Sequence, residues 1–330
     1  MNTNVKLLPT FSAKRLQPLF ALLVMIVAMS FMSDRFLTAE NGWNICRQIS
    51  VNLCLSIGMT LVVVSGGIDL SVGAVLAVAG AVAAKLLKFG ITLTALGAHV
   101  EFTVCGALLA ALATGAVLGA ANGVAITRLA LPPFVATLAM MSVARGLSLL
   151  YTGGFPVTGL GASFDFIGTG AWLGIPAPVW IVACLSIAGL VICHRTPFGR
   201  HLYAVGGSER AARLTGLNVN GIKVAVYLVC GALSGLAGVL VTARLDSAQP
   251  DAGIGYELDS IAAVVIGGTS LSGGEGSIAG TVVGCLIIGV LNNGLTLLNV
   301  SPFWQQIVKG LVIIVAVALD RFGRSRQRLT

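Results

Sequence analysis

Two short polar segments carry the side chains of this chain that are best suited to hydrogen-bond a neutral solute. Residues 63–73 read VVSGGIDLSVG and residues 264–274 read VVIGGTSLSGG, so a valine pair, a double glycine, a Leu-Ser pair and a final glycine recur in register. Each segment offers hydroxyls and backbone groups that the glycines leave unpaired, and only the first adds a carboxylate. The residues concerned are Gly66, Gly67, Asp69, Ser71, Gly267, Gly268, Thr269, Ser270 and Ser272.

The same residues also have a purely structural interpretation. A double glycine ends a helix easily, and an Asp or Ser ahead of an apolar run caps the next helix by accepting hydrogen bonds from its free amides. We therefore expect Asp69 and Ser270 to cap two helices that start at equivalent points. Whether the two breaks also contact a solute is left open by the pattern.

The chain carries no motif for nucleotide hydrolysis, covalent catalysis or metal binding. It has no G-x-x-x-x-G-K-[ST] loop, no G-x-S-x-G elbow and no H-E-x-x-H pair. The seven cysteines lie in or beside apolar segments without C-x-x-C spacing, so we expect neither a disulfide nor a metal site. We predict that the chain is not an enzyme and holds no cofactor of its own.

Composition indicates that lipid is the solvent of this chain. Of its 330 residues, 56% are hydrophobic and only 10% are charged, against roughly 25% charged residues in soluble domains. The formal net charge is +8, but the basic residues collect between apolar stretches, which favours a topology signal over a nucleic-acid-binding face. We predict an all-α fold, a polytopic transmembrane bundle of about ten helices, some short or broken, in a single domain over residues 1–330.

Apolar stretches define the expected helices. They cover residues 16–32, 48–64, 72–87, 102–121, 134–150, 179–193, 224–243, 261–266, 278–298 and 304–319. The eighth stretch follows an acidic loop at 244–259 and is too short to cross a bilayer, which takes about 20 residues, so we interpret it as a half-helix. Arg145 lies inside the fifth stretch, where a charge facing lipid is costly, and we expect it to face protein.

Basic residues predict the orientation of the bundle. The segment 194–223 carries five lysines or arginines against a single Glu209, so the positive-inside rule places it in the cytoplasm. Ten crossings then put both termini on the cytoplasmic side, in agreement with the basic residues of 1–16 and 321–328. Within 194–223, the stretch 208–216 has the pattern of a short capped helix, which must fold against the membrane domain or dock on a partner.

The two breaks together predict a transporter. Non-helical backbone at membrane depth is tolerated only where it is buried in protein or lines a wet cavity, and paired breaks are typical of duplicated transporters. We therefore assign the two breaks to a substrate pathway. Because few ionisable residues lie inside the predicted spans, a partner subunit is a better energy source than an ion gradient.

Four groups of residues closely resemble the ribose-type permease family of bacterial ABC importers. They are 58–73, the stretch PFVATL from Pro133 with Arg145-Gly146, the stretch TPFGR from Thr196 through Gly216, and 257–274. The resemblance covers nearly the whole chain. Two departures are Ser208, where family members often have Asn, and Glu275, where a small or basic residue is commoner.

The resemblance implies a multi-pass permease of the bacterial inner membrane that pairs with a second permease, as a homo- or heterodimer. It implies import of a monosaccharide such as ribose, galactose or galactofuranose, delivered by a periplasmic binding protein. A separate ATPase subunit would bind ATP and Mg, and a coupling helix would seat in it. The residues of that helix are Glu209, Ala211, Ala212, Arg213 and Gly216.

Two alternatives remain at this stage. A branched-chain amino acid permease has a similar composition, and half-helix ends with free backbone groups suit a zwitterion as well as a sugar. An ion-coupled carrier that acts alone is the second alternative.

Overall fold

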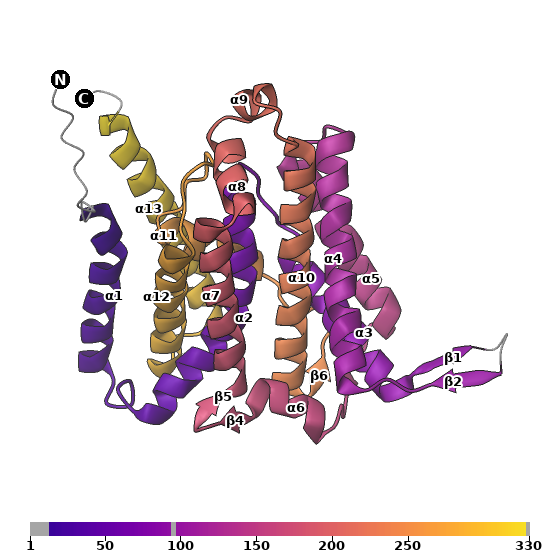
Figure 1. Cartoon of the computed structure of the whole chain (residues 1–330). Helices are drawn as coiled ribbons and strands as arrows, with labels where there is room; N and C mark the ends of the chain where they lie inside the picture. Colours follow the sequence, from indigo (N-terminus) through magenta and orange to yellow (C-terminus); the bar gives the residue numbers. More distant parts are fainter. Residues whose placement is uncertain (1–12, 94–96, 328–330) are drawn as a thin grey trace.

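The computed structural model describes residues 13–93 and 97–327 as a bundle of helices with a few very short strands (Figure 1). The helices are α1 (Ala13–Met32), α2 (Ala39–Val64), α3 (Val72–Phe89), α4 (Val104–Arg128), α5 (Pro133–Thr152), α6 (Ala162–Thr169), α7 (Ala177–Arg195), α8 (Pro197–Gly207), α9 (Glu209–Leu214), α10 (Val219–Leu245), α11 (Tyr256–Ile266), α12 (Ile278–Leu297) and α13 (Pro302–Gln327). The end of the bundle that carries α9 is called the upper end below.

The strands form three antiparallel pairs of two or three residues. They are β1 (Ile91–Leu93) with β2 (Ala98–Val100), β3 (Val157–Thr158) with β6 (Ser247–Ala248), and β4 (Ala171–Trp172) with β5 (Ile175–Pro176). Together with α6 they lie at the lower end (Figure 1).

The helical polytopic bundle expected from the sequence is confirmed. Among the described residues, seven helices are long and apolar enough to cross a membrane, namely α2, α3, α4, α5, α7, α10 and α12. Shorter apolar stretches lie in α1 (Gln17–Met32) and α13 (Pro302–Val315), and α11 has 11 residues. These elements follow the ten predicted stretches in order, and they differ mainly in extending further at their polar ends.

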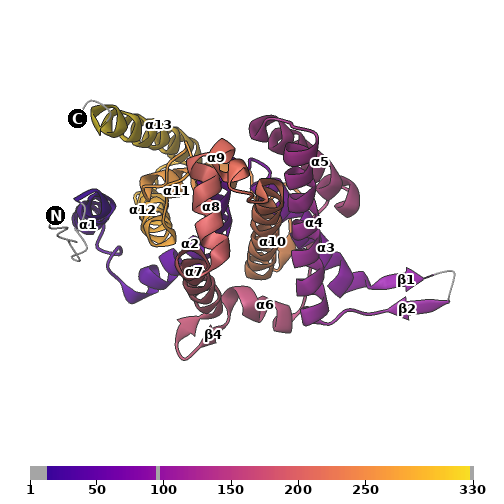
Figure 2. The same ribbon diagram turned by 45° about the horizontal axis from the view of Figure 1, so that its top comes forward.

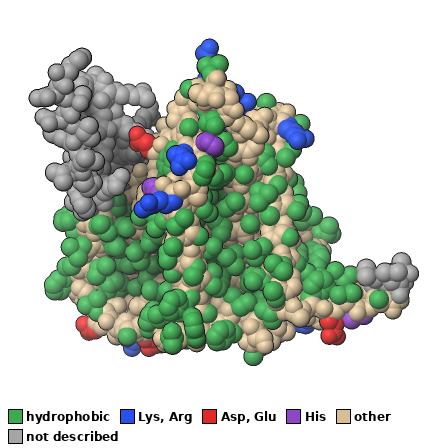
Figure 3. All heavy atoms as spheres, viewed as in Figure 1, with side chains coloured by type: hydrophobic (Ala, Val, Ile, Leu, Met, Phe, Trp, Pro, Cys, Tyr) green, Lys and Arg blue, Asp and Glu red, His purple; other side chains and the backbone are tan. Residues whose placement is uncertain are grey.

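The surface has the polarity of a membrane protein. Hydrophobic side chains cover the middle of the bundle, and charged ones gather towards its two ends (Figure 3). The start of α1, the end of α13 and the short helix α9 all lie at the upper end (Figure 1). Residues 1–12 and 328–330, part of the basic ends used above to orient the chain, lie outside the described residues.

Helix α10 occupies the centre of the bundle (Figure 2). Glycines let α4 approach it along its length, because Gly115 and Gly119 of α4 face Gly231 of α10 backbone to backbone. A Cβ added at Gly119 would meet the carbonyl oxygen of Tyr227 and the Cα of Gly231. Small residues of this kind allow close packing where no water drives helices together.

Helix α3 begins near the middle of the bundle. Its residues Leu76 and Gly80 contact Gly238, and Gly80 also contacts Thr242, so α3 runs parallel to the lower half of α10. Helix α2 runs the opposite way, with Gly58 against Cys230 in the upper half of α10. The connection between them, residues 65–71, therefore descends from the upper end into the interior, and we call it the upper re-entrant segment.

A second connection enters from the lower end. Residues 246–255 leave the bottom of α10, and Gly253 reaches the backbone of Gly73 at the start of α3. We call residues 246–255 the lower re-entrant segment. The expectation of a simple acidic loop over 244–259 is therefore wrong, because 256–259 already belong to α11 and the preceding residues are drawn into the bundle.

We predict that Gly119→Val forces α4 away from α10, because the added side chain has no space against Tyr227 and Gly231. Overpacking of this kind costs about 1 to 3 kcal/mol. The thermal midpoint of the detergent-purified protein, followed by the loss of its monodisperse elution peak after heating, should fall clearly below that of the wild type.

The matched control is Gly146→Ala on α5, where no atom lies close to the added methyl group. This variant should match or slightly exceed the wild type, because alanine favours helix over glycine. Equal midpoints for Gly119→Val and Gly146→Ala would contradict the packing role of the glycines.

Candidate functional site

Both breaks begin with the same helix ending. After α2, the amide of Gly66 donates to the Val63 carbonyl (2.9 Å) and the amide of Gly67 to the Val62 carbonyl (3.0 Å). Gly66 has a φ of +82°, a conformation that favours glycine. This pair of bonds is a Schellman motif, which satisfies the last carbonyls of a helix.

The second break repeats the motif with a shift of one residue. After α11, the amide of Gly268 donates to Val265 (2.9 Å) and that of Thr269 to Val264 (3.1 Å), and Gly268 has a φ of +87°. Gly267, the partner of Gly66 in the aligned sequences, is still the helix cap. The interpretation of each double glycine as a helix end therefore fits both copies.

Asp69 and Ser270 make equivalent turns. The Oδ1 atom of Asp69 accepts hydrogen bonds from the amide (2.9 Å) and the hydroxyl (2.6 Å) of Ser71. The Asn122 amide donates to the Ser71 hydroxyl (2.9 Å), which ties the turn to α4. In the second copy, the Ser270 hydroxyl accepts from the Ser272 amide (3.1 Å). Each polar side chain thus binds the amide two residues ahead.

The expected equivalence of the two helix starts is wrong. Helix α3 begins at Val72 with Ser71 at the N-cap position, so Asp69 stabilises the turn before the cap. In the second copy, the Ser270 amide donates to the Glu275 carbonyl and closes a loop. Helix α12 starts only at Ile278, where Ser277 is the N-cap, and Ser270 caps no helix.

The two breaks lie against each other at the upper end of the bundle. The amide of Gly274 donates to the carbonyl of Val64 (2.9 Å), and Gly273 packs on the backbone of Gly66. A hydrogen bond between the hydroxyls of Thr60 on α2 and Thr281 on α12 (2.6 Å) joins the flanking helices nearby. The structure therefore brings together the residues that the sequence paired.

Most of the predicted pathway side chains are enclosed by protein. Asp69 is 1% exposed, and the side chains of Ser71, Thr269 and Ser270 are fully buried. Among the remaining predicted residues, Gly66, Gly268 and Ser272 are exposed. The pathway assignment of the two breaks stays a prediction.

Arg145 faces protein, as expected. Its Nη1 atom donates to the carbonyls of Pro250 and Ala252, both at 2.9 Å, and the Ser148 hydroxyl donates to Pro250 as well (3.1 Å). Two side chains of α5 therefore hold the lower re-entrant segment. The backbone groups of an irregular segment inside a membrane need such partners.

An ion pair inside the bundle was missed by the sequence analysis. Lys309 of α13 lies 2.9 Å from the carboxylate of Asp259 at the start of α11, and their side chains are 26% and 11% exposed. The available signal was a lysine in the middle of the last apolar stretch. Such a charge needs a partner when it lies within a membrane.

Helix α9 forms the tip of the upper end (Figure 1). Ser208 caps it by accepting from the Ala211 amide (3.3 Å), and the amides of Gly216 and Leu217 close its other end. Ala212 is buried against α8 and α10, whereas Leu214 is 82% exposed. The helix is thus fixed on one side and presents an apolar side chain on the other.

Ion pairs brace this helix. Glu209 accepts from Lys223 (2.6 Å) and from Arg213 (2.8 Å). These hydrogen bonds, the one from Lys223 first, hold the pKa of the Glu209 carboxyl below its usual value. The two pairs therefore stabilise the tip above the pKa of the unfolded carboxyl, and this contribution is lost as the pH falls through the lowered folded-state pKa.

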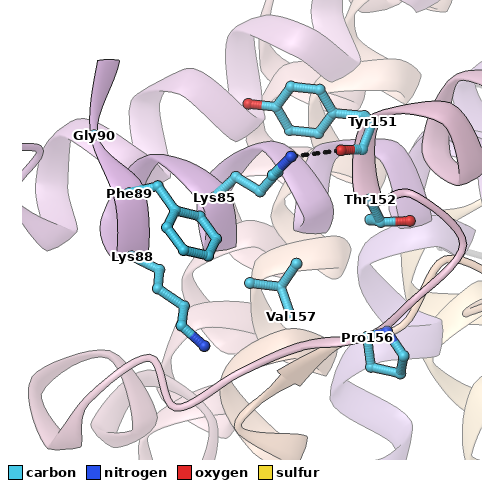
Figure 4. A pocket seen from close by; sticks show the side chains of 8 residues that line it. All are labelled: Lys85, Lys88, Phe89, Gly90, Tyr151, Thr152, Pro156 and Val157. Carbon is cyan, nitrogen blue, oxygen red and sulfur yellow. Dashed lines mark hydrogen bonds between the residues drawn. The ribbon is translucent and has the colours of Figure 1, made fainter. Parts of the chain in front are cut away.

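A cavity of about 560 Å³ lies at the lower end, between the ends of α3 and α5 (Figure 4). Its lysines are engaged, since Lys85 donates to the Tyr151 carbonyl (2.7 Å) and Lys88 to the Thr158 carbonyl (2.6 Å). Lys85 also lies over the Tyr151 ring, 4.8 Å from its centre. These contacts tie the end of α3 to the loop after α5. The other lining residues are Phe89, Gly90, Thr152, Pro156 and Val157.

The fold and these features belong to a known class of membrane protein. Residues 43–317 match the family model described as branched-chain amino acid transport system / permease component, and the chain belongs to this permease family. It is 51% identical over 306 residues to the ribose import permease protein RbsC of Escherichia coli (strain K12), which covers 92% of each chain. The resemblance to ribose-type permeases is thereby confirmed.

Other relatives extend the comparison. RbsC of Bacillus subtilis (strain 168) is 48% identical over 310 residues, 93% of each chain. The D-allose transport system permease protein AlsC of E. coli (strain K12) is 39% identical over 306 residues, 92% of this chain and 90% of the relative. No solved structure matches the chain.

We predict that Asp69→Asn is tolerated, because an amide oxygen can still accept from the Ser71 amide. Asp69→Leu removes the acceptor and should lower the free energy of unfolding by about 0.5 to 1.5 kcal/mol, as expected for a lost hydrogen bond. Thermal midpoints of the purified variants test the stability effect, and uptake in the assembled transporter tests function.

A role of the Asp69 charge in transport would give a different pattern. Asp69→Asn would then keep the wild-type midpoint but lose uptake. Equal stability and equal uptake in all three proteins would contradict both roles.

Proposed function

We propose that this chain is the membrane-spanning permease subunit of an ATP-driven importer of ribose. The observation that carries the proposal is the 51% identity, over 92% of both chains, to a protein named as a ribose import permease. Relatives named for D-allose and L-arabinose are less similar, at 39% and 36%. The chain is therefore not an enzyme in this proposal, and ATP with its Mg binds to a partner ATPase.

We also propose the assembly that this role requires. The chain lies in the bacterial inner membrane with its upper end and both termini in the cytoplasm, where 194–223 is the coupling loop. It pairs with a second permease, identical or related, and takes the sugar from a periplasmic binding protein at its lower end. The basic character of 194–223 supports this orientation through the positive-inside rule.

Helix α9 is the proposed contact with the ATPase. The coupling residues are Glu209, Ala211, Ala212 and Arg213 of this helix and Gly216 just after it. Their contacts show which of them fix the helix and which are exposed. Ala212 and Glu209 face α8 and α10 and fix the helix. Ala211 and Leu214 are exposed, and we assign the Leu214 side chain to an apolar contact with the ATPase.

A branched-chain amino acid permease is the second candidate, because the family model carries that description. An ion-coupled carrier is less well supported. In the described spans, Arg145 and the Asp259–Lys309 pair are engaged in contacts with protein, which leaves few groups to relay an ion.

Uptake by proteoliposomes tests the function. The chain is reconstituted with its partner ATPase and binding protein, and radiolabelled ribose is supplied with the binding protein outside and ATP inside. We expect ATP-dependent ribose uptake that disappears when the ATPase is omitted. Leucine uptake without ribose uptake would favour the amino acid permease, and uptake driven by an ion gradient without the ATPase would favour the carrier.

A substitution on α9 tests the coupling role separately. Leu214→Glu should reduce co-purification of the ATPase at least several-fold and lower uptake, because a charge replaces the exposed apolar contact. Thr215→Glu on the same tip is the control, since it adds the same charge at a neighbouring exposed residue. Normal ATPase binding by Leu214→Glu would contradict this contact, whatever the transported solute.

A further inference from the structure

The lower re-entrant segment exposes polar groups between the lower end and the middle of the bundle. Gln249 and Asp251 are exposed, and Ile254 beside them is 68% exposed. No hydrogen bond from the described residues reaches the Asp251 carboxylate. Further along, Leu258 on the first turn of α11 is 51% exposed, so the same face continues onto the helix.

Two sets of contacts fix the depth of this segment. Gly253 lies against Gly73 at the start of α3, level with the middle of α10. On α5, Ala144 packs with Ala74 and Val75 of the same turn of α3, and the next residue is Arg145. Residues 250–253 of the segment therefore lie inside the membrane-spanning region, above the strand β6 at the lower end.

Charge is concentrated on this face. Arg145 interacts electrostatically with both Glu257 and Asp251. Its guanidinium is held by the carbonyls of Pro250 and Ala252, and a carboxylate oxygen of Glu257 accepts from the Gly255 amide (3.2 Å). Arg145 and Glu257 thus shape the segment, while Asp251 remains exposed.

Lipid does not suit this face. Irregular backbone at membrane depth occurs only where protein covers it or water fills the space beside it, and an ionised carboxylate facing hydrocarbon is costly. A dry protein cover would bury the Asp251 charge and would itself be costly. A water-filled space satisfies both constraints.

We propose that the lower re-entrant segment lines the path of the solute, with Asp251 as a contact for sugar hydroxyls and Arg145 as the residue that positions the segment. The proposal rests on the function proposed above. A carboxylate accepts hydrogen bonds from the hydroxyls of a neutral sugar, and water competes for it, so the contact is weak enough to let the solute move on. The upper breaks, by comparison, keep their polar side chains buried.

Water access at position 251 tests the proposal without reference to the solute. Asp251→Cys is made in a chain whose two exposed cysteines, Cys105 and Cys184, are replaced by serine. The assembled complex in membranes is treated with a membrane-impermeant thiol reagent. We expect labelling at least tenfold faster than for Ile187→Cys, a control at a 62% exposed apolar position on α7. Equal, slow labelling of both would overturn the proposal.

Uptake measurements then test the contact itself. Asp251→Asn and Asp251→Leu should lower the maximal rate of ribose uptake at least tenfold without loss of assembly with the ATPase. Ile187→Leu, at the exposed apolar position on α7, should transport like the wild type. A wild-type rate of ribose uptake in Asp251→Leu would show that Asp251 faces lipid. Loss of assembly with the ATPase in that variant would show that Asp251 lies in a protein interface. Either result overturns the proposal.

The two arms separate this proposal from the proposed function. Failure of the wild-type complex to transport ribose would refute the ribose assignment, while fast labelling at position 251 would still support a wet path. Arg145→Lys adds a readout for positioning. Lysine cannot bridge both carbonyls in the same way, so labelling at position 251 should change at least threefold. An unchanged labelling rate at position 251 in Arg145→Lys would contradict the positioning role of Arg145.

Discussion

The need to pair every backbone group inside a membrane constrains this structure more than any other factor. A helix satisfies its own groups, but the two re-entrant segments do not, and each requires partners from elsewhere in the chain. The upper segment closes α2 with a Schellman motif and uses Asp69 to bind the Ser71 amide. The lower segment relies on Arg145 and Ser148 of α5. These few polar contacts allow two irregular stretches to enter the bundle from opposite ends.

Glycine packing supplies the space in which those contacts form. Helix α10 meets α4 through Gly231 and α3 through Gly238, so both neighbours lie unusually close to it. Close backbones position Asn122 of α4 within reach of Ser71 on the upper segment. The polar network and the apolar packing are thus parts of one arrangement, in which an error in helix spacing would also misplace the hydrogen-bonding groups.

The sequence predicted the helices well because hydropathy and the breaks at Gly66 and Gly268 are local signals. It did not predict that residues 246–255 enter the bundle, since an acidic loop and an acidic re-entrant segment look alike until their neighbours are known. The predicted stretch 278–298 matches α12, but the expectation that Ser270 caps it was wrong for a related reason. Ser270 has the right type for a cap, but a bond from its amide to Glu275 decides the backbone there. The match between Asp259 and Lys309 requires two helices to meet, which periodicity does not reveal.

That ion pair bears on how the chain enters its membrane. Lys309 and Asp259 lie on different helices, and either charge alone would resist transfer into hydrocarbon during synthesis. Helix α11 is made before α13, so the Asp259 carboxylate gains this counter-ion only after α13 has been made. The last helix therefore supplies the charge that stabilises the first turn of an earlier helix. A chain that stopped after α12 would leave the Asp259 carboxylate inside the bundle without its counter-ion.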